Sequence, residues 1–160
     1  MQTIDTTRRT LLKGTALAMT LGITGVAQLL TMPSAQAAWP KTAFDSESMG
    51  DTMKALFNEE IAPKDSADIT LKAPDIAENG AVVPISVKSS MPDVTRIIIL
   101  VEDNPQPMTA SFNLGEGVKA DVSTRIKMGK TSNVIALVET KSGVYAARKN
   151  VKVTIGGCGG

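Results

Sequence analysis

The sequence predicts a mainly β protein: an immunoglobulin-like antiparallel β-sandwich of about seven strands, with an N-terminal helix before it and a flexible glycine-cysteine arm after it. After Pro63, the helical period of apolar residues gives way to seven short stretches rich in Val, Ile and Thr. Clusters of Gly, Asn, Asp, Ser and Pro separate these stretches, as turn residues do between antiparallel strands. Seven short strands at this spacing are typical of an immunoglobulin-like sandwich.

The first 37 residues are predicted to be a signal peptide. Arg8, Arg9 and Lys13 precede an uncharged stretch over residues 14–30, and Ala-Gln-Ala at 35–37 forms a small-residue cleavage site. The arginine pair, followed by two leucines and a lysine, resembles the twin-arginine export motif. A general secretory signal is the alternative, and a retained membrane anchor is disfavoured because the apolar stretch is short and interrupted by glycine. We therefore expect export of a domain over 38–155 and an arm over 156–160.

The composition excludes several classes of function. The 160 residues suffice for one ordinary domain. The predicted signal takes three of the 17 basic and one of the 16 acidic residues, so the remaining chain has 14 and 15, a net charge of −1 that argues against a nucleic-acid partner. The sequence has no histidine, the commonest general base and zinc or copper ligand. We expect no self-sufficient hydrolase, no metal site and no cofactor.

An amphipathic helix is predicted over residues 45–61. Asp45 or Ser46 is expected to cap its start, and Ala62-Pro63 to mark its end, because the residue before proline avoids helical geometry. Packing on its own domain is the favoured role of this helix, and docking on another protein is the alternative. Its apolar residues recur on one helical face: Met49, Met53, Leu56, Phe57 and Ile61.

The predicted strands come after the helix. Turn residues separate them at 79–80, 103–105, 115–117, 129–130 and 141–143. The strands are expected near residues 68–72, 81–88, 94–102, 109–114, 118–128, 133–139 and 144–155.

Two of these strands carry further information. Residues 97–101 form an unbroken apolar run, which is expected to be covered on both faces. The opposite sheet is one cover, and the N-terminal helix or a partner subunit is the other. The last strand alternates and should anchor the C-terminal segment, with inward side chains from Val151, Val153 and Ile155.

After the last strand the chain reads Gly156-Gly157-Cys158-Gly159-Gly160. The cysteine is the only one in the sequence, so it has no internal disulfide partner. Glycine restricts the backbone least and makes the narrowest chain, which lets a cysteine enter a tight channel in another protein. Three extended residues beyond the last strand reach about 10 Å. We therefore expect a carrier arm whose reactive group is the thiol of Cys158.

The arginine pair, a β domain of this length and the Gly-Gly-Cys-Gly-Gly segment together resemble the SoxY family. Its members are the sulfur-carrier subunits of the SoxYZ complex in the periplasmic, thiosulfate-oxidising Sox system. The resemblance covers essentially the whole chain, and the Gly-Gly-Cys-Gly-Gly segment is specific. It implies that Cys158 covalently binds thiosulfate-derived sulfur, with a persulfide among the intermediates, and that this chain is a carrier and no enzyme.

The resemblance also implies partners and a location. A SoxZ-like subunit would form a heterodimer with this chain and be exported with it. Transient docking would bring the arm to a c-type haem thiol-oxidising enzyme (SoxAX), a dimanganese hydrolase (SoxB) and a molybdenum and haem sulfur dehydrogenase (SoxCD). The expected location is the periplasm, reached by the twin-arginine pathway, with no membrane contact after signal cleavage.

Two other classes of function share part of this pattern. An exported immunoglobulin-like binding module could use Cys158 for an intermolecular disulfide, and it would give a stable dimer without sulfur adducts. A thiol oxidoreductase or metallochaperone would need a second cysteine or a histidine, and the sequence has neither. Neither class accounts for glycine on both sides of the cysteine.

Overall fold

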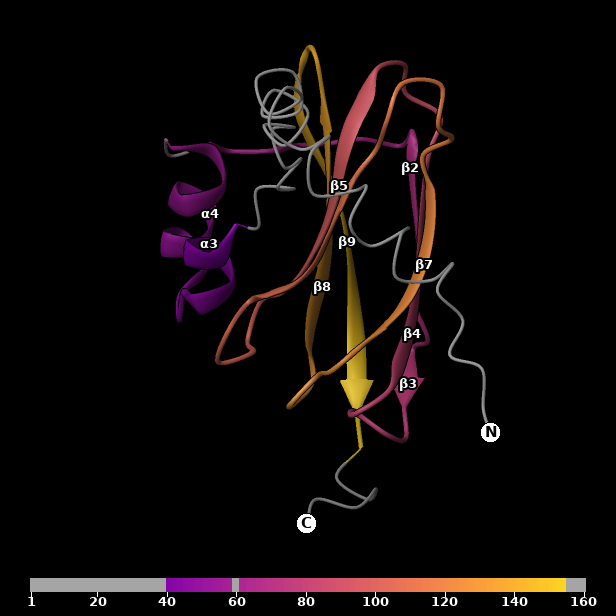
Figure 1. Ribbon diagram of the computed structural model, residues 1–160. Coiled ribbons are helices and arrows are strands. Elements are labelled where there is room, and N and C mark those ends of the chain that lie inside the picture. The colour runs from indigo at the N-terminus through magenta and orange to yellow at the C-terminus, as the bar shows by residue number, and fades with distance from the viewer. Residues whose placement is uncertain (1–39, 59–60, 155–160) are drawn as a thin grey trace, which may run out of the picture. The chain divides into compact units, whose positions relative to one another are not determined.

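Two compact units divide the chain in the computed structural model, Met1–Trp39 and Pro40–Gly160. The structure describes residues 40–58 and 61–154, all of them in the second unit (Figure 1). Arg8, Arg9 and the predicted arm over 156–160 lie outside the described residues.

The predicted helix over 45–61 is present as α4 (Met49–Phe57), but both of its predicted bounds were wrong, and a further short helix, α3 (Lys41–Asp45), precedes it. Helix α4 does not begin at Asp45, because Ser46 (φ −68°, ψ 135°) and Ser48 (φ −129°, ψ 152°) are extended. The predicted caps were wrong as well. Ser48 caps α4: its Oγ accepts a hydrogen bond from the Asp51 N–H at 3.0 Å, and its hydroxyl donates to the Asp51 carboxylate at 2.7 Å.

The end of α4 lies before the predicted Ala62-Pro63 boundary. Asn58 adopts the left-handed conformation (φ 56°), which non-glycine residues rarely do except asparagine and aspartate. Its N–H donates to the Lys54 carbonyl at 2.8 Å and closes the last turn. The C-terminal signal of this helix was therefore an asparagine, not the later proline.

The described residues after α4 form nine strands, and the seven longer ones correspond to the seven predicted. β1 and β3 have two residues each and pair in parallel with β9, so the sandwich is not purely antiparallel. The strands are β1 (Lys64–Asp65), β2 (Ile69–Lys72), β3 (Ile76–Ala77), β4 (Val83–Ser89), β5 (Val94–Val101), β6 (Met108–Asn113), β7 (Asp121–Ile126), β8 (Ser132–Thr140) and β9 (Gly143–Val153).

The strands form two sheets in an immunoglobulin-like order. One sheet runs β1-β9-β8-β5-β6, with β3 also on β9, and the other runs β2-β4-β7. Among the seven longer strands, the first, second and fifth therefore share one sheet, and the third, sixth and seventh share the other, as in immunoglobulin domains. The fourth strand, β6, pairs antiparallel with the third, β5. The predicted fold class is confirmed.

The main core lies between the two sheets. It is aliphatic and includes alternate residues of β5, namely Ile97, Ile99 and Val101, each 0% exposed. The facing sheet contributes its inward side chains from β2, β4 and β7: Ile69, Val83, Ile85, Val87 and Ile126.

A second apolar cluster covers the outer face of the larger sheet. Ile98 and Leu100, the intervening residues of β5, are 0% and 1% exposed and pack with Ala43 of α3 and Leu56 of α4. The helix pair lies beside this sheet, on the side away from β2, β4 and β7 (Figure 1). The prediction that residues 97–101 are covered on both faces is confirmed. The opposite sheet covers one face, and α3 and α4 cover the other. The helix packs on its own domain, as favoured.

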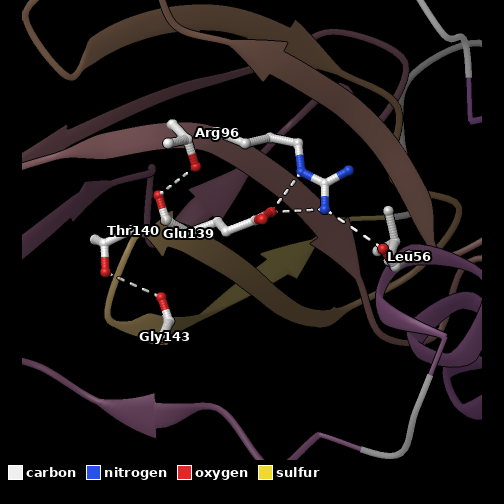
Figure 2. A network of polar contacts seen from close by, with 6 residues as sticks. Leu56, Arg96, Glu139, Thr140 and Gly143 are labelled. Atoms are coloured by element: carbon white, nitrogen blue, oxygen red, sulfur yellow. Dashed lines mark hydrogen bonds and ion pairs between the residues drawn. The ribbon is translucent and has the colours of Figure 1, made fainter.

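One polar network fastens α4 to the sheet (Figure 2). The Nε and Nη2 atoms of Arg96 on β5 lie 2.7 and 2.6 Å from the Glu139 carboxylate on β8. Nη2 also donates to the Leu56 carbonyl at 3.4 Å, and the guanidinium lies 5.5 Å from the centre of the Phe57 ring. A cation at the C-terminal end of a helix is stabilising. Arg96 therefore holds the helix pair against the sheet.

No helix within residues 40–58 or 61–154 is long and apolar enough to cross a membrane.

Candidate functional site

β9 is the strand that leads toward the predicted arm. Four of its side chains belong to or pack against the main core: Val151 is 0% exposed, and Tyr145, Ala147 and Val153 pack against the same cluster. Lys152 and Thr154 are exposed. The predicted inward positions of Val151 and Val153 are confirmed, while Ile155 lies beyond the described range.

Backbone hydrogen bonds hold the last described residues of β9 from two sides. On one side, the N–H groups of Lys152 and Thr154 donate to the carbonyls of Asp75 and Ala77, at 3.0 and 3.1 Å. On the other side, the N–H of Val153 donates to the Thr131 hydroxyl at 3.0 Å. We call residues 152–154 and these three partners the arm base. The arm base fixes the chain up to Thr154.

The loop over residues 78–82 packs tightly against the arm base. The Met128 N–H donates to the Gly80 carbonyl at 2.7 Å. A Cβ at Gly80 would lie 2.3 Å from the Met128 carbonyl oxygen and 2.9 Å from Cγ1 of Val153, so only glycine fits there. The predicted turn at residues 79–80 is present, since the Asn79 side chain accepts from the Ala81 N–H at 2.9 Å.

A second loop braces the same end of the sandwich. Nδ2 of Asn104 donates to the Lys127 carbonyl at 2.8 Å, and Oδ1 of Asn104 accepts from the Gly129 N–H at 3.0 Å. Ser132 is only 2% exposed, and its hydroxyl accepts from the Asp103 N–H at 2.9 Å. These contacts tie the β5–β6 loop to the β7–β8 loop. The end of the sandwich next to the arm base is therefore a preformed surface.

The predicted reactive residues are not among those that the structure describes. Cys158, its neighbours Gly156, Gly157, Gly159 and Gly160, and the signal residues Arg8 and Arg9 stay predictions, as does the absence of a cofactor. Within the described part of the chain, no three side chains of His, Cys, Asp or Glu lie together as a metal site would require.

Sequence reasoning missed the residues that hold the arm base. Asp75 and Ala77 belong to β3 and the residue before it, a segment too short to show a strand periodicity. Thr131 lies in a turn, where a hydroxyl gives no distinctive signal. The available signal was Asn79-Gly80, a turn motif that placed a chain reversal directly after β3.

Chain geometry limits how far the cysteine can lie from this surface. Cys158 is the fourth residue after Thr154, and a fully extended chain spans at most about 3.6 Å per residue, hence roughly 14 Å over these four steps. Chain length alone therefore limits the distance of Cys158 from Thr154 and the arm base to about 14 Å.

Comparison with solved structures finds a similar chain described as the sulfur carrier protein SoxY from Chlorobium limicola f thiosulfatophilum. It is 42% identical, with a TM-score of 0.59, and the match covers 66% of this chain and 94% of that chain. A chain of a structure described as "Structural basis of T cell specificity and activation by the bacterial superantigen toxic shock syndrome toxin-1" matches at 10% identity and a TM-score of 0.39, over 54% of this chain and 99% of that chain, too weakly to carry an argument. No curated protein sequence matches.

A family match agrees with the first of these structures. The profile of the family described as "Sulfur oxidation protein SoxY" matches residues 53–158, more than half of the chain. The matched range includes most of α4, the nine described strands and Cys158. The chain belongs to the SoxY family of sulfur oxidation proteins.

Proposed function

We propose that this chain is a sulfur carrier of thiosulfate oxidation, which binds sulfur intermediates covalently on Cys158 and presents them to separate enzymes. The observation that carries the proposal is the family match over residues 53–158, because it reaches the only cysteine of the chain. The similar solved structure is described as a sulfur carrier protein, which supports the same role.

Loading of the arm is an oxidation. The Cys158 thiolate and thiosulfate join through a new sulfur–sulfur bond, giving Cys–S–S–SO₃⁻ and releasing two electrons. A c-type haem enzyme of the SoxAX type accepts these electrons. The carrier supplies the thiolate and the reach, and the enzyme supplies the oxidant.

Unloading is a hydrolysis. Water attacks the terminal sulfone of Cys–S–S–SO₃⁻, the bond between that sulfone and the next sulfur breaks, and sulfate, a cysteine persulfide anion and two protons result. A SoxB-type hydrolase would catalyse this step, and a SoxCD-type dehydrogenase would oxidise the persulfide sulfur before a second hydrolysis. Both enzymes act on the same carrier, so the thiol must be accessible to several active sites in turn.

The described structure supports a carrier with a fixed body and a separate reactive segment. The arm base holds the backbone up to Thr154 by three hydrogen bonds, so docking need not order this part of the chain. The glycines around Cys158 leave room for passage through a narrow channel. An enzyme can therefore bind a rigid surface and receive the cysteine in one encounter.

The heterodimer and the location belong to the same proposal. A SoxZ-like subunit would pair with this chain, and the twin-arginine signal with Arg8 and Arg9 would carry the folded pair to the periplasm. Because α3 and α4 already cover Ile98 and Leu100, that subunit is not needed to cover the apolar run of β5. Its interface is expected elsewhere on the sandwich.

The test separates a carrier arm from a linker cysteine. Cys158→Ser should abolish thiosulfate-dependent turnover by reconstituted enzymes and leave the fold unchanged, because only the nucleophile is removed. Valine at Gly156 and Gly157 keeps the thiol but widens and stiffens the arm. Enzymatic loading should then fall steeply while alkylation by iodoacetamide proceeds at the parental rate. Unimpaired loading of the valine variant would refute the arm mechanism.

A further inference from the structure

Large apolar side chains are rarely exposed on the described surface, and most of those exposed lie beside the arm base. Among residues 40–58 and 61–154, three such side chains are exposed: Ile76 at 57%, Val82 at 47% and Val118 at 57%. A single exposed apolar residue is normal on any protein. Two exposed apolar side chains on segments that adjoin the arm base suggest a contact surface for another protein.

Hydrogen bonds fix the positions of Ile76 and Val82 relative to the arm base. Ile76 lies on β3 directly opposite Lys152 of β9, and Figure 1 shows β3 beside the end of β9. Val82 is the last residue of the loop over 78–82, in which Gly80 packs against Met128 and Val153, and its N–H donates to the Asn79 carbonyl at 3.3 Å. Neither side chain is expected to change place when a partner binds, since the backbone on both sides is hydrogen-bonded.

The length of the chain between Thr154 and Cys158 decides what must lie over this surface. Four residues span at most about 14 Å. With strands about 4.8 Å apart and about 3.3 Å of rise per residue, Ile76 lies within roughly 10 Å of Thr154. A protein that takes Cys158 several ångströms deep into a recessed site therefore has to place the entrance of that site over the arm base.

The charges around this surface balance one another. Lys127 and Lys152 are exposed and form no ion pair with any described residue, and the same holds for the acidic Glu78 and Glu102. With two cations against two anions, net charge gives little attraction to a partner of either sign. Apolar contact is the main source of affinity that remains.

We propose that Ile76 and Val82 form the docking contact through which this chain binds proteins that take Cys158 into a recessed active site. The occupant is a protein with an apolar rim around the entrance of that site. The proposal rests on the carrier function and adds the surface by which the carrier is recognised. Docking through a few apolar residues beside the arm also allows several enzymes to use the same surface in turn.

The test is steady-state loading of Cys158 with thiosulfate by a purified haem-dependent thiol-oxidising enzyme, with the full carrier complex as the varied substrate. Ile76→Ser and Val82→Ser should each raise KM about tenfold, equivalent to about 1.4 kcal/mol of docking energy, with kcat unchanged. Val118→Ser is the matched control, because Val118 is as exposed as Ile76 but lies in the loop before β7. Its KM should equal that of the parent.

Two further measurements complete the test. Iodoacetamide alkylation of Cys158 and the melting temperature should be the same in all variants, which excludes a change in thiol reactivity or in folding. Parental KM in the Ile76→Ser/Val82→Ser double variant, or an equal rise in Val118→Ser, would overturn the docking surface while the carrier function stands. Absence of any loading in the parent would overturn the carrier function and the docking surface together.

Discussion

Truncation of Ile98 tests whether the helix pair really supplies the outer cover of the larger sheet. Ile98 is 0% exposed and packs in the cluster formed with Ala43 of α3 and Leu56 of α4. Ile98→Ala removes three carbon atoms from this cluster and adds no polar group. The change therefore measures packing between the sheet and the helices alone.

The expected cost is derived from the burial. Transfer of three buried carbons from water is worth about 0.8 kcal/mol each, or about 2.5 kcal/mol in all. The cavity left behind adds to this, so a total of about 3 to 4 kcal/mol is expected, within the range for Ile→Ala in protein cores. A loss of this size is a large part of the roughly 5–15 kcal/mol that holds a typical domain together.

Urea unfolding of the chain from Ala38 onward, alone and with its partner subunit, measures the effect. The full loss should be present in the chain alone, because the cover comes from its own helices. Val118→Ala should stay within about 0.5 kcal/mol of the parent, since that side chain is 57% exposed. A cost below about 1 kcal/mol in the chain alone, rising only in the complex, would show that the partner covers the sheet.

Further predictions concern one backbone contact and the export signal. Gly80→Ala should lower the free energy of unfolding by more than about 2 kcal/mol in urea titrations, since the new Cβ would lie 2.3 Å from the Met128 carbonyl oxygen; Gly50→Ala in α4, where the nearest atom is 4.0 Å away, should instead raise it by up to about 1 kcal/mol. Destabilisation in both would contradict the steric argument. Lysine at Arg8 and Arg9 keeps the charge but removes the arginine pair, so precursor should accumulate inside the cell; undiminished export would indicate a general secretory signal.

The longer strands were predictable because their physical signals are local. Stretches of β-branched residues between turn residues located all seven, and the unbroken run over residues 97–101 correctly predicted a sheet covered on both faces. Only the start of β7 moved noticeably, to Asp121, because Gly117 (φ 76°) and the exposed Val118 belong to the preceding turn. An unbroken apolar run shows in the sequence that a strand is buried on both faces. The sequence does not show which segment covers the second face.

The remaining features depend on contacts between distant segments. β1 and β3 are strands because they pair with β9, which is distant in the sequence. A two-residue segment such as Ile76–Ala77 is too short to show a strand pattern in the sequence. The break between α3 and α4 lies at Ser46 and Ser48, two extended residues just before the helical apolar pattern that begins at Met49. Ser48 was as good a cap by composition as Ser46, and only the hydrogen bond to Asp51 distinguishes them.

The candidate site divides in the same way. Cys158 and its glycines stay a prediction from the sequence, made from the chemistry of the segment without any fold, and the range of the family match includes that cysteine. The surface beside it was not predictable, because the exposure of Ile76 and Val82 becomes visible only when β3 is placed on β9.

Intact-mass analysis of the carrier after incubation with thiosulfate and the haem-dependent enzyme tests the central claim most directly. The carrier account predicts a mass increase of one thiosulfate group on each chain, located at Cys158 by peptide mapping, removed by a thiol reductant and absent in Cys158→Ser. An unchanged mass, or a shift only to a disulfide-linked dimer, would contradict the account and favour a cysteine that links subunits.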